Sequence, residues 1–250
     1  MRKKLLYIII SLSIFVLILI AINLVDIINV KKEREYQKLK SALKVLYIEL
    51  NNSDLSIIRG EKLNIDYNKK DIDITINDKK VYISEKNNQS SNIEIAIPND
   101  FTFNQLSIKT NKGNINLSSI VCEFFSVSSE SGNVSIDNFN ITNKTDLAIN
   151  SSNMNIKDSM MHNVDVFIKD GSLTYDGILD GKNEINTSSG TLNFNLDDKL
   201  DNYQIIILDN NKNIKVNNKT INNESYTKGN KIIKINGKGK IEINGDVTYE

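Results

Sequence analysis

The sequence predicts an all-β protein, a β-solenoid with coils of about 19–20 residues, behind one N-terminal transmembrane helix. Two observations predict this fold class. A glycine or serine followed by alternating apolar residues returns at nearly constant spacing, and a long apolar run follows the basic N-terminus. In chain order, we expect an anchor over 1–30, a charged juxtamembrane helical stalk over 31–44, irregular strands that lead into and cap the coils over 45–105, regular repeats over 106–200, and a C-terminal β cap over 201–250.

The regular repeats are marked by turn residues spaced 19, 20, 19 and 19 positions apart. These structural repeat turns are Gly113, Gly132, Ser152, Gly171 and Gly190. Apolar residues stand two and four positions after each turn residue and five before it, as in SGNVSI at 131–136. Glycine or serine permits a tight bend, and alternation turns one face of each strand toward the core. Ser152 replaces the usual glycine and is expected to weaken one corner.

A period near 20 residues is too short for a propeller blade or a helical hairpin, but it suits one coil of a solenoid. Equivalent apolar residues of successive coils would then stack into continuous internal columns. An antiparallel sandwich with short hairpins would show the same alternation, but it does not require equal spacing. The constant period therefore favours the solenoid.

The N-terminal run over 5–24 is apolar apart from Ser11, Ser13 and Asn23. About 20 helical residues span the ~30 Å hydrocarbon core of a bilayer. Basic residues at 2–4 precede the run, and no small-x-small cleavage site follows it, so we expect an uncleaved single-pass anchor rather than a signal peptide. Positive residues flank both ends of the run, so the positive-inside rule alone does not fix the orientation.

Between the stalk and the regular repeats, several stretches alternate polar and apolar residues, including VLYIEL at 45–50 and KVYISE at 80–85. Polar residues bound each stretch, which indicates short strands. Further strands are expected at 205–208, 231–235 and 241–243. An open solenoid end exposes apolar columns and unpaired backbone groups, so we expect both irregular regions to act as caps. An incomplete cap would permit end-to-end association.

Residues that could carry chemistry form no recognisable site. His162 is the only histidine and Cys122 the only cysteine, which argues against a multi-histidine metal site, a catalytic triad and an intrachain disulfide framework. Asp71 and Asp73 alternate and are expected to be a pair of solvated carboxylates on one strand face rather than a calcium site. GKGK at 237–240 lacks the first glycine of a phosphate loop. We expect no catalytic residue, no metal and no cofactor.

The composition argues against some classes of partner and substrate. The 31 basic and 31 acidic residues give a formal net charge of zero, which argues against a nucleic-acid partner, and the asparagine-rich stretches are interpreted as polar loops. Five residues after the turns, the chain has Ser118, Asp137, Lys157, Asp176 and Asn195. This mixture differs from the clustered acids of a glycan-cleaving enzyme. Four aromatic residues could stack on sugars if exposed, but core packing is expected. They are Phe124, Phe125, Tyr175 and Phe194.

The SGNVSI-type repeats, the N-terminal anchor and the late turn GKGKIEI at 237–243 resemble the bacterial putative-adhesin family of β-strand-repeat domains of unknown function. The resemblance covers residues 45–250. It implies a solenoid behind a membrane anchor or polar leader, a role at the cell surface or in envelope stress, and no established catalytic residues. It favours a C-terminal domain outside the cell, in contact with a cell-wall polymer or an envelope protein.

Three functions remain open. The first is a non-enzymatic, membrane-anchored cell-surface module that acts as an adhesin or as an envelope-associated binding or stress-related protein. The second is a membrane-tethered scaffold that polymerises through its solenoid ends, similar to bactofilins. The third is a carbohydrate-active enzyme, which the missing acid pair disfavours.

Overall fold

The computed structural model describes residues 33–34, 36–77, 79–208, 213–221 and 229–246. The chain divides into one unit over Met1–Ala42 and a second over Leu43–Glu250. In the first unit, residues 33–34 and 36–42 are α-helical. The predicted anchor over 1–30 lies outside the described residues. No helix within the described part of the chain has the length and apolar character needed to cross a membrane.

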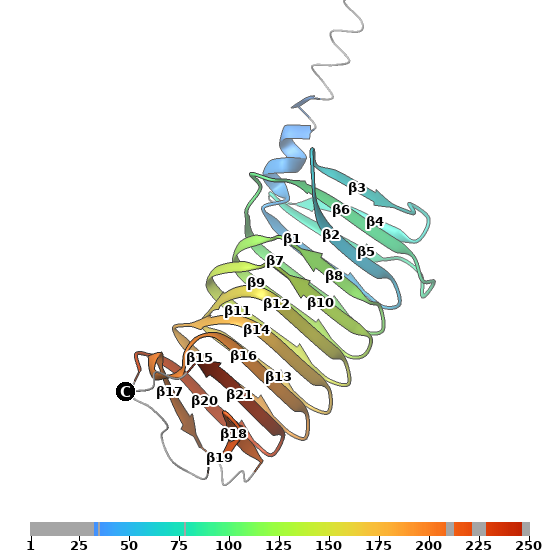
Figure 1. Cartoon of the computed structure of the whole chain (residues 1–250). Helices are drawn as coiled ribbons and strands as arrows, with labels where there is room; N and C mark the ends of the chain where they lie inside the picture. Colours follow the sequence, from blue (N-terminus) through green and yellow to red (C-terminus); the bar gives the residue numbers. More distant parts are fainter. Residues whose placement is uncertain (1–32, 35, 78, 209–212, 222–228, 247–250) are drawn as a thin grey trace, which may run out of the picture. The chain divides into compact units, whose positions relative to one another are not determined.

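The second unit is an all-β, solenoid-like stack of coils, in which each coil contributes strands to two long ladders (Figure 1). In spatial order, the first ladder contains β4 (Ile72–Asn77), β5 (Lys80–Glu85), β1 (Val45–Leu50), β7 (Phe103–Thr110), β9 (Val121–Ser129), β11 (Asn140–Ile149), β13 (Val164–Ile168), β15 (Lys182–Thr187), β20 (Lys231–Gly237) and β17 (Tyr203–Ile207).

The second ladder runs beside the first along the same coils. Its strands, in the same spatial order, are β3 (Asn64–Tyr67), β6 (Asn92–Pro98), β2 (Asp54–Gly60), β8 (Ile115–Ser118), β10 (Asn133–Asp137), β12 (Asn153–His162), β14 (Ser172–Asp180), β16 (Thr191–Lys199), β21 (Lys240–Asp246), β18 (Ile214–Val216) and β19 (Lys219–Thr220). A single-turn 3-10 helix, η1 (Leu200–Asn202), follows β16.

The core consists of apolar columns that run from coil to coil in strict register. In the first ladder, Ile108, Val127, Leu147, Val166 and Ile185 are consecutive partners. In the second ladder, the same holds for Ile115, Val134, Met154, Leu173 and Leu192. All ten side chains are buried. Burial of each such side chain contributes about 1.5–3 kcal/mol, so the columns supply the main stabilisation of the stack. The 19–20-residue period therefore corresponds to one coil.

The order of the coils in space differs from their order in the chain. The coil of β1 and β2 lies between that of β5 and β6 and that of β7 and β8. At the other end, the coil of β20 and β21 lies between that of β15 and β16 and that of β17 and β18. Each end of the stack thus contains a coil inserted beneath an outer one.

Antiparallel strands interrupt the parallel ladders at the ends. β4 pairs with β5 and β3 pairs with β6 at the N-terminal end, and β19 pairs with β18 at the C-terminal end. The strands expected only as irregular caps over 45–105 include coils in register with the regular repeats, because β1 and β2 pair in parallel with β7 and β8.

Candidate binding surfaces

The predicted turn residues lie in the turns immediately before β8, β10, β12, β14 and β16. A Cβ on Gly132, whose φ is +105°, would stand 2.7 Å from the Gly113 carbonyl oxygen, so the neighbouring coil leaves no room for a side chain. Ser152 is buried, with its Oγ 2.5 Å from Ser129 Oγ. The corner at Ser152 thus contains a side-chain hydrogen bond between two coils.

Exposed apolar side chains gather on the outer side of the first ladder. Tyr82, Phe124 and Phe167 are 39–54 % exposed and lie on β5, β9 and β13. The expectation that Phe124 packs in the core is wrong, because it is 43 % exposed, whereas Phe125, Tyr175 and Phe194 are buried as expected. Adjacent residues of a strand point to opposite sides, so Phe124 and Phe125 cannot both face the core. We call this outer side the aromatic face.

Ion pairs between neighbouring coils accompany the aromatic residues on this face. Lys109 Nζ lies 2.8 Å from Glu49 Oε1, and Lys144 Nζ lies 2.9 Å from Asp165 Oδ2. These side chains are about half exposed or more. Exposed pairs of this kind contribute little to stability, at most about 1 kcal/mol each. They leave the aromatic face with mixed charge.

A hollow of about 410 Å³ opens on the aromatic face beside two tyrosines. Tyr47 on β1 and Tyr82 on β5 are register partners, and their rings stack with centroids 5.1 Å apart and planes 10° from parallel. The Tyr47 hydroxyl donates a hydrogen bond of 3.1 Å to Gln105 Oε1. Glu49 and Lys109 also line the hollow. It therefore combines an aromatic wall with polar groups.

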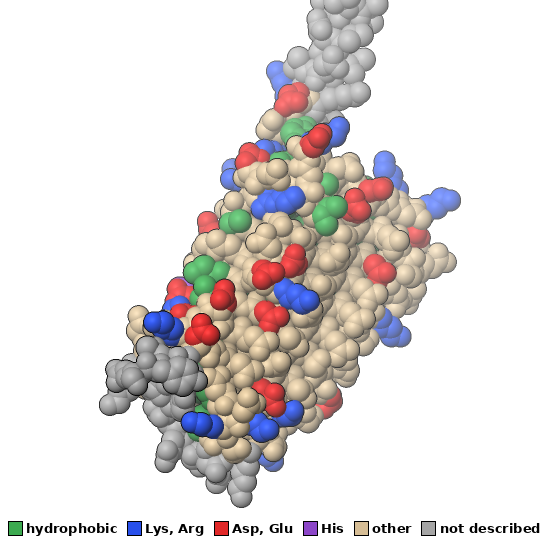
Figure 2. Space-filling model, in the orientation of Figure 1, with side chains coloured by type: hydrophobic (Ala, Val, Ile, Leu, Met, Phe, Trp, Pro, Cys, Tyr) green, Lys and Arg blue, Asp and Glu red, His purple; other side chains and the backbone are tan. Residues whose placement is uncertain are grey.

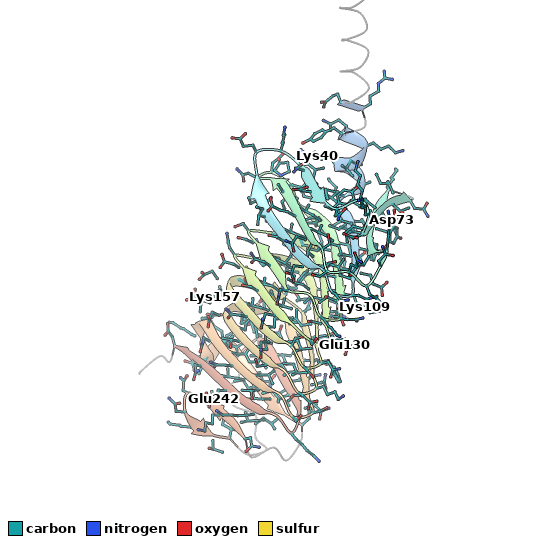
Figure 3. The ribbon with its side chains drawn as sticks, turned by 90° about the vertical axis from the view of Figure 1, so that its right-hand side faces the viewer. Lys40, Asp73, Lys109, Glu130, Lys157 and Glu242 are labelled. Carbon is teal, nitrogen blue, oxygen red and sulfur yellow. The ribbon has the colours of Figure 1, made fainter. Side chains whose placement is uncertain are left out.

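The outer side of the second ladder has a different character. Small polar side chains occupy one column across six consecutive coils: Ser56, Asn116, Ser135, Asn155, Thr174 and Asn193. Figure 2 shows a broad tan area over this ladder with charged side chains around it. In Figure 3, Lys157 and Glu242 of this ladder lie toward the left of the ribbon, whereas Asp73 and Lys109 of the first ladder lie toward the right.

Asparagines beside this polar column bind one coil to the next. Asn133 Nδ2 lies 3.3 Å from Asn114 Oδ1, and Ser172 Oγ donates a 2.7 Å hydrogen bond to Asn153 Oδ1. These asparagines thus form side-chain ladders, in which an amide satisfies a group on the neighbouring coil. The second ladder therefore uses much of its polar surface to hold the stack together.

Comparison with known proteins gives the family. Residues 25–248 match the Toastrack DUF4097 family. The chain belongs to this family. The resemblance predicted from the SGNVSI-type repeats is thereby confirmed at the level of a β-strand-repeat domain of unknown function. No curated protein matches the sequence.

Two crystal structures are similar to this Toastrack chain at low identity. A "putative adhesin" from Bacteroides fragilis NCTC 9343 has 13 % identity and a TM-score of 0.47, with 82 % of this chain and 94 % of that chain covered. A "putative cell adhesion protein" from Clostridium sporogenes ATCC 15579 has 14 % identity and a TM-score of 0.32, with 84 % and 95 % covered.

In this Toastrack chain, the residues that could carry chemistry are buried or contact neighbouring side chains. His162 Nδ1 lies 3.0 Å from Asp180 Oδ2. Cys122 is buried, and this burial raises the pKa of its thiol to about 12, far from that of a nucleophile. The expected pair of solvated carboxylates is wrong, because Asp71 is only 9 % exposed and its Oδ2 accepts a 2.6 Å hydrogen bond from Asn68 Nδ2, whereas Asp73 is exposed.

A second groove, of about 580 Å³, lies at a corner of the solenoid beside β10, β12, β14 and β16. Asp158, Asp176 and Asp197 line it. Asn195 Nδ2 donates to Asp176 Oδ1, so this carboxylate is already engaged in a contact between coils. No group of three or more potential metal ligands is found among the described residues. The groove is therefore a polar corner of the stack.

Proposed function

We propose that the chain is a non-enzymatic, membrane-anchored cell-surface module whose solenoid binds a cell-wall polymer or an envelope protein. Residues 1–30 would anchor it in the cell membrane, with the solenoid outside the cell. Adhesion is one version of this role, and a part in the envelope stress response is another. The observation that carries the proposal is the aromatic face, where Tyr82, Phe124 and Phe167 are exposed on one side of a rigid parallel ladder.

The contrast between the two ladders supports a binding role for the aromatic face. Isolated exposed apolar side chains are common on protein surfaces, whereas their concentration on one side indicates interaction. Three aromatic side chains are exposed there, whereas an outward column of the second ladder contains only serine, threonine and asparagine from β2 to β16. Aromatic residues contribute large contact areas to interfaces at a low cost in side-chain entropy.

The first experiment tests localisation. The full chain carries a C-terminal tag, and protease is added to intact and to lysed cells after the cell wall has been removed. We expect the tag to be lost from intact cells. Protection of the tag until lysis would place the solenoid inside and contradict the proposal.

The second experiment tests binding by the aromatic face. Full-length protein in detergent is sedimented with isolated cell-envelope material. We expect the double variant Phe124→Asp and Phe167→Asp to lose most of the bound fraction, because buried carboxylates would be desolvated at the contact. The matched variant Ser135→Asp and Thr174→Asp on the second ladder should bind like the original chain. Equal binding by both variants would refute the role of the aromatic face.

A further inference from the structure

The stack of tyrosine rings on the aromatic face ends abruptly. Tyr47 and Tyr82 lie on neighbouring strands, but the register partner of Tyr47 on the next strand is Ser107, and Ser126 follows on β9. Tyr82 covers one face of the Tyr47 ring. A serine side chain is too small to cover a phenol ring. The opposite face of Tyr47 therefore has no aromatic partner among the described residues.

The hollow of about 410 Å³ lies where this stack ends. Tyr47, Tyr82 and Ser107 line it together with Glu49, Ser84 and Lys109. Its volume falls within the range of ligand sites, roughly 300–1,000 Å³. A six-membered ring placed over Ser107 would continue the stack at the strand spacing of about 4.8 Å. The fold thus leaves one position of a regular stack open to a ligand.

Hydrogen-bonding groups surround this open position. Glu49 and Lys109 form an ion pair of 2.8 Å, and their side chains are 69 % and 60 % exposed. Neither the Ser84 nor the Ser107 hydroxyl hydrogen-bonds to another described residue. Carboxylate, ammonium and hydroxyl groups together supply both acceptors and donors. Because Glu49 and Lys109 neutralise each other, this rim suits an uncharged ligand.

Lys80 is the other cation close to the tyrosines. Its Nζ lies 5.8 Å from the centroid of the Tyr47 ring. Lys80 comes from β5, the strand that also carries Tyr82, and β5 and β7 flank β1 on opposite sides. Together with Lys109, which is paired with Glu49, Lys80 does not form the cluster of cations that would select a phosphate or another polyanion.

We propose that the hollow binds one uncharged pyranose ring of a glycan, with the C–H face of the sugar against Tyr47. The face of an aromatic ring is electron-rich and attracts groups of partial positive charge, such as these C–H bonds. The sugar hydroxyls then hydrogen-bond to Glu49, Lys109 and the two serines. A protein partner would need a larger apolar contact than this hollow offers. The proposal rests on the proposed binding function and names the ligand class at one site.

A single sugar ring binds weakly, so the test uses immobilised oligosaccharides, on which repeated contacts increase retention. The probes are tetrasaccharides of glucose, mannose and N-acetylglucosamine, with polygalacturonate as the polyanionic comparison. Full-length protein in detergent is passed over each matrix. We expect retention on at least one neutral probe and release by the free neutral sugar.

Two pairs of variants test the site. Tyr47→Ala should lower the affinity about tenfold, as expected from loss of an aromatic contact. Its control is Tyr67→Ala, a half-buried tyrosine on β3 of the second ladder. Ser107→Phe should fill the open position and also abolish retention. Its control is Ser126→Phe, which lies in the same outward column on the next coil and does not line the hollow. Circular dichroism verifies that each variant is folded.

The outcomes separate this proposal from the more general one. Loss of retention in both hollow variants, with both controls unchanged, supports the sugar site. Retention on polygalacturonate alone, or folded Tyr47→Ala and Ser107→Phe proteins that bind neutral sugars normally, overturns it. If no neutral probe retains the chain while envelope material still does, the sugar site is refuted and the binding function stands. If envelope material also fails to bind, the binding function itself is refuted.

Discussion

Replacement of Gly132 by alanine should destabilise the solenoid at its centre. Gly132 has φ of +105°, and a Cβ there would lie 2.7 Å from the carbonyl oxygen of Gly113 and 2.9 Å from that of Lys112. The positive φ costs an L-residue about 1–2 kcal/mol. Displacing two backbone carbonyls of the neighbouring coil adds about 1–3 kcal/mol, by analogy with overpacked cores. We therefore expect Gly132→Ala to lower the free energy of unfolding by about 2–5 kcal/mol.

Thermal unfolding of the full chain in detergent, followed by circular dichroism, measures this effect. For a domain of this size, each kcal/mol corresponds to about 2–4 °C, so Tm should fall by about 4–20 °C. Gly60→Ala is the matched control, because Gly60 does not have a positive φ and the nearest atom to its added Cβ is the Ala96 side chain at 3.1 Å. The control should change stability by less than about 1 kcal/mol. Equal shifts in Tm for the two variants would show that the close approach of the coils does not determine stability.

Three further predictions concern buried or half-buried polar groups. Ser152→Gly restores the common turn residue, yet it should destabilise the fold by about 1 kcal/mol in chemical denaturation, because it removes the 2.5 Å hydrogen bond to Ser129; an unchanged midpoint would contradict this. Cys122, whose thiol pKa burial raises to about 12, should react with iodoacetamide at neutral pH only after unfolding, and labelling of the native protein would argue against its burial. Burial opposes ionisation of Asp198, but hydrogen bonds to its carboxylate, led by the one from Lys231, outweigh burial and lower the pKa of Asp198. The ionised carboxylate therefore stabilises the fold at pH values above the unfolded-state pKa of about 4. This contribution is lost as pH falls through the lower folded-state pKa. The stability difference between the original chain and Asp198→Asn should accordingly shrink in acid, and a constant difference from neutral pH to pH 2 would contradict the assigned shift.

The sequence predicts the coils because their apolar residues recur at fixed spacing. Val134 and Met154 stand in equivalent positions in the sequence, and they are register partners in the structure. In the irregular region, where the period is absent, alternation alone does not specify how the strands pair. It predicts which side of β1 is buried, but any strand with the same alternation could pair beside it. The insertion of β1 between β5 and β7 therefore has no signal in the local sequence.

The candidate sugar site also depends on the insertion of β1 beside β5, so the local sequence does not predict it. Tyr47 and Tyr82 are 35 positions apart and meet only because β1 pairs with β5. A weak signal exists, since LYIE at 46–49 and VYIS at 81–84 align with the two tyrosines in one column. It lies outside the region of constant period, so the period does not support it. Phe124 shows a related limit, because aromatic character suggested the core whereas strand alternation, applied strictly, predicts exposure next to Phe125.

The arrangement of the end coils bears on the scaffold hypothesis. A polymer built through solenoid ends needs each end to offer parallel strands to the next molecule. At the N-terminal end, the outer strands β3 and β4 are antiparallel to the ladders that they complete. Asp73 on β4 is exposed and lies 3.8 Å from Lys86, and charged residues at an edge oppose the addition of another strand. The coil of β1 and β2 lies between two other coils. The outermost strands at this end, β3 and β4, are therefore unsuited to pairing with another solenoid. These features favour a module that binds through its side, where Tyr82, Phe124 and Phe167 are exposed on the first ladder.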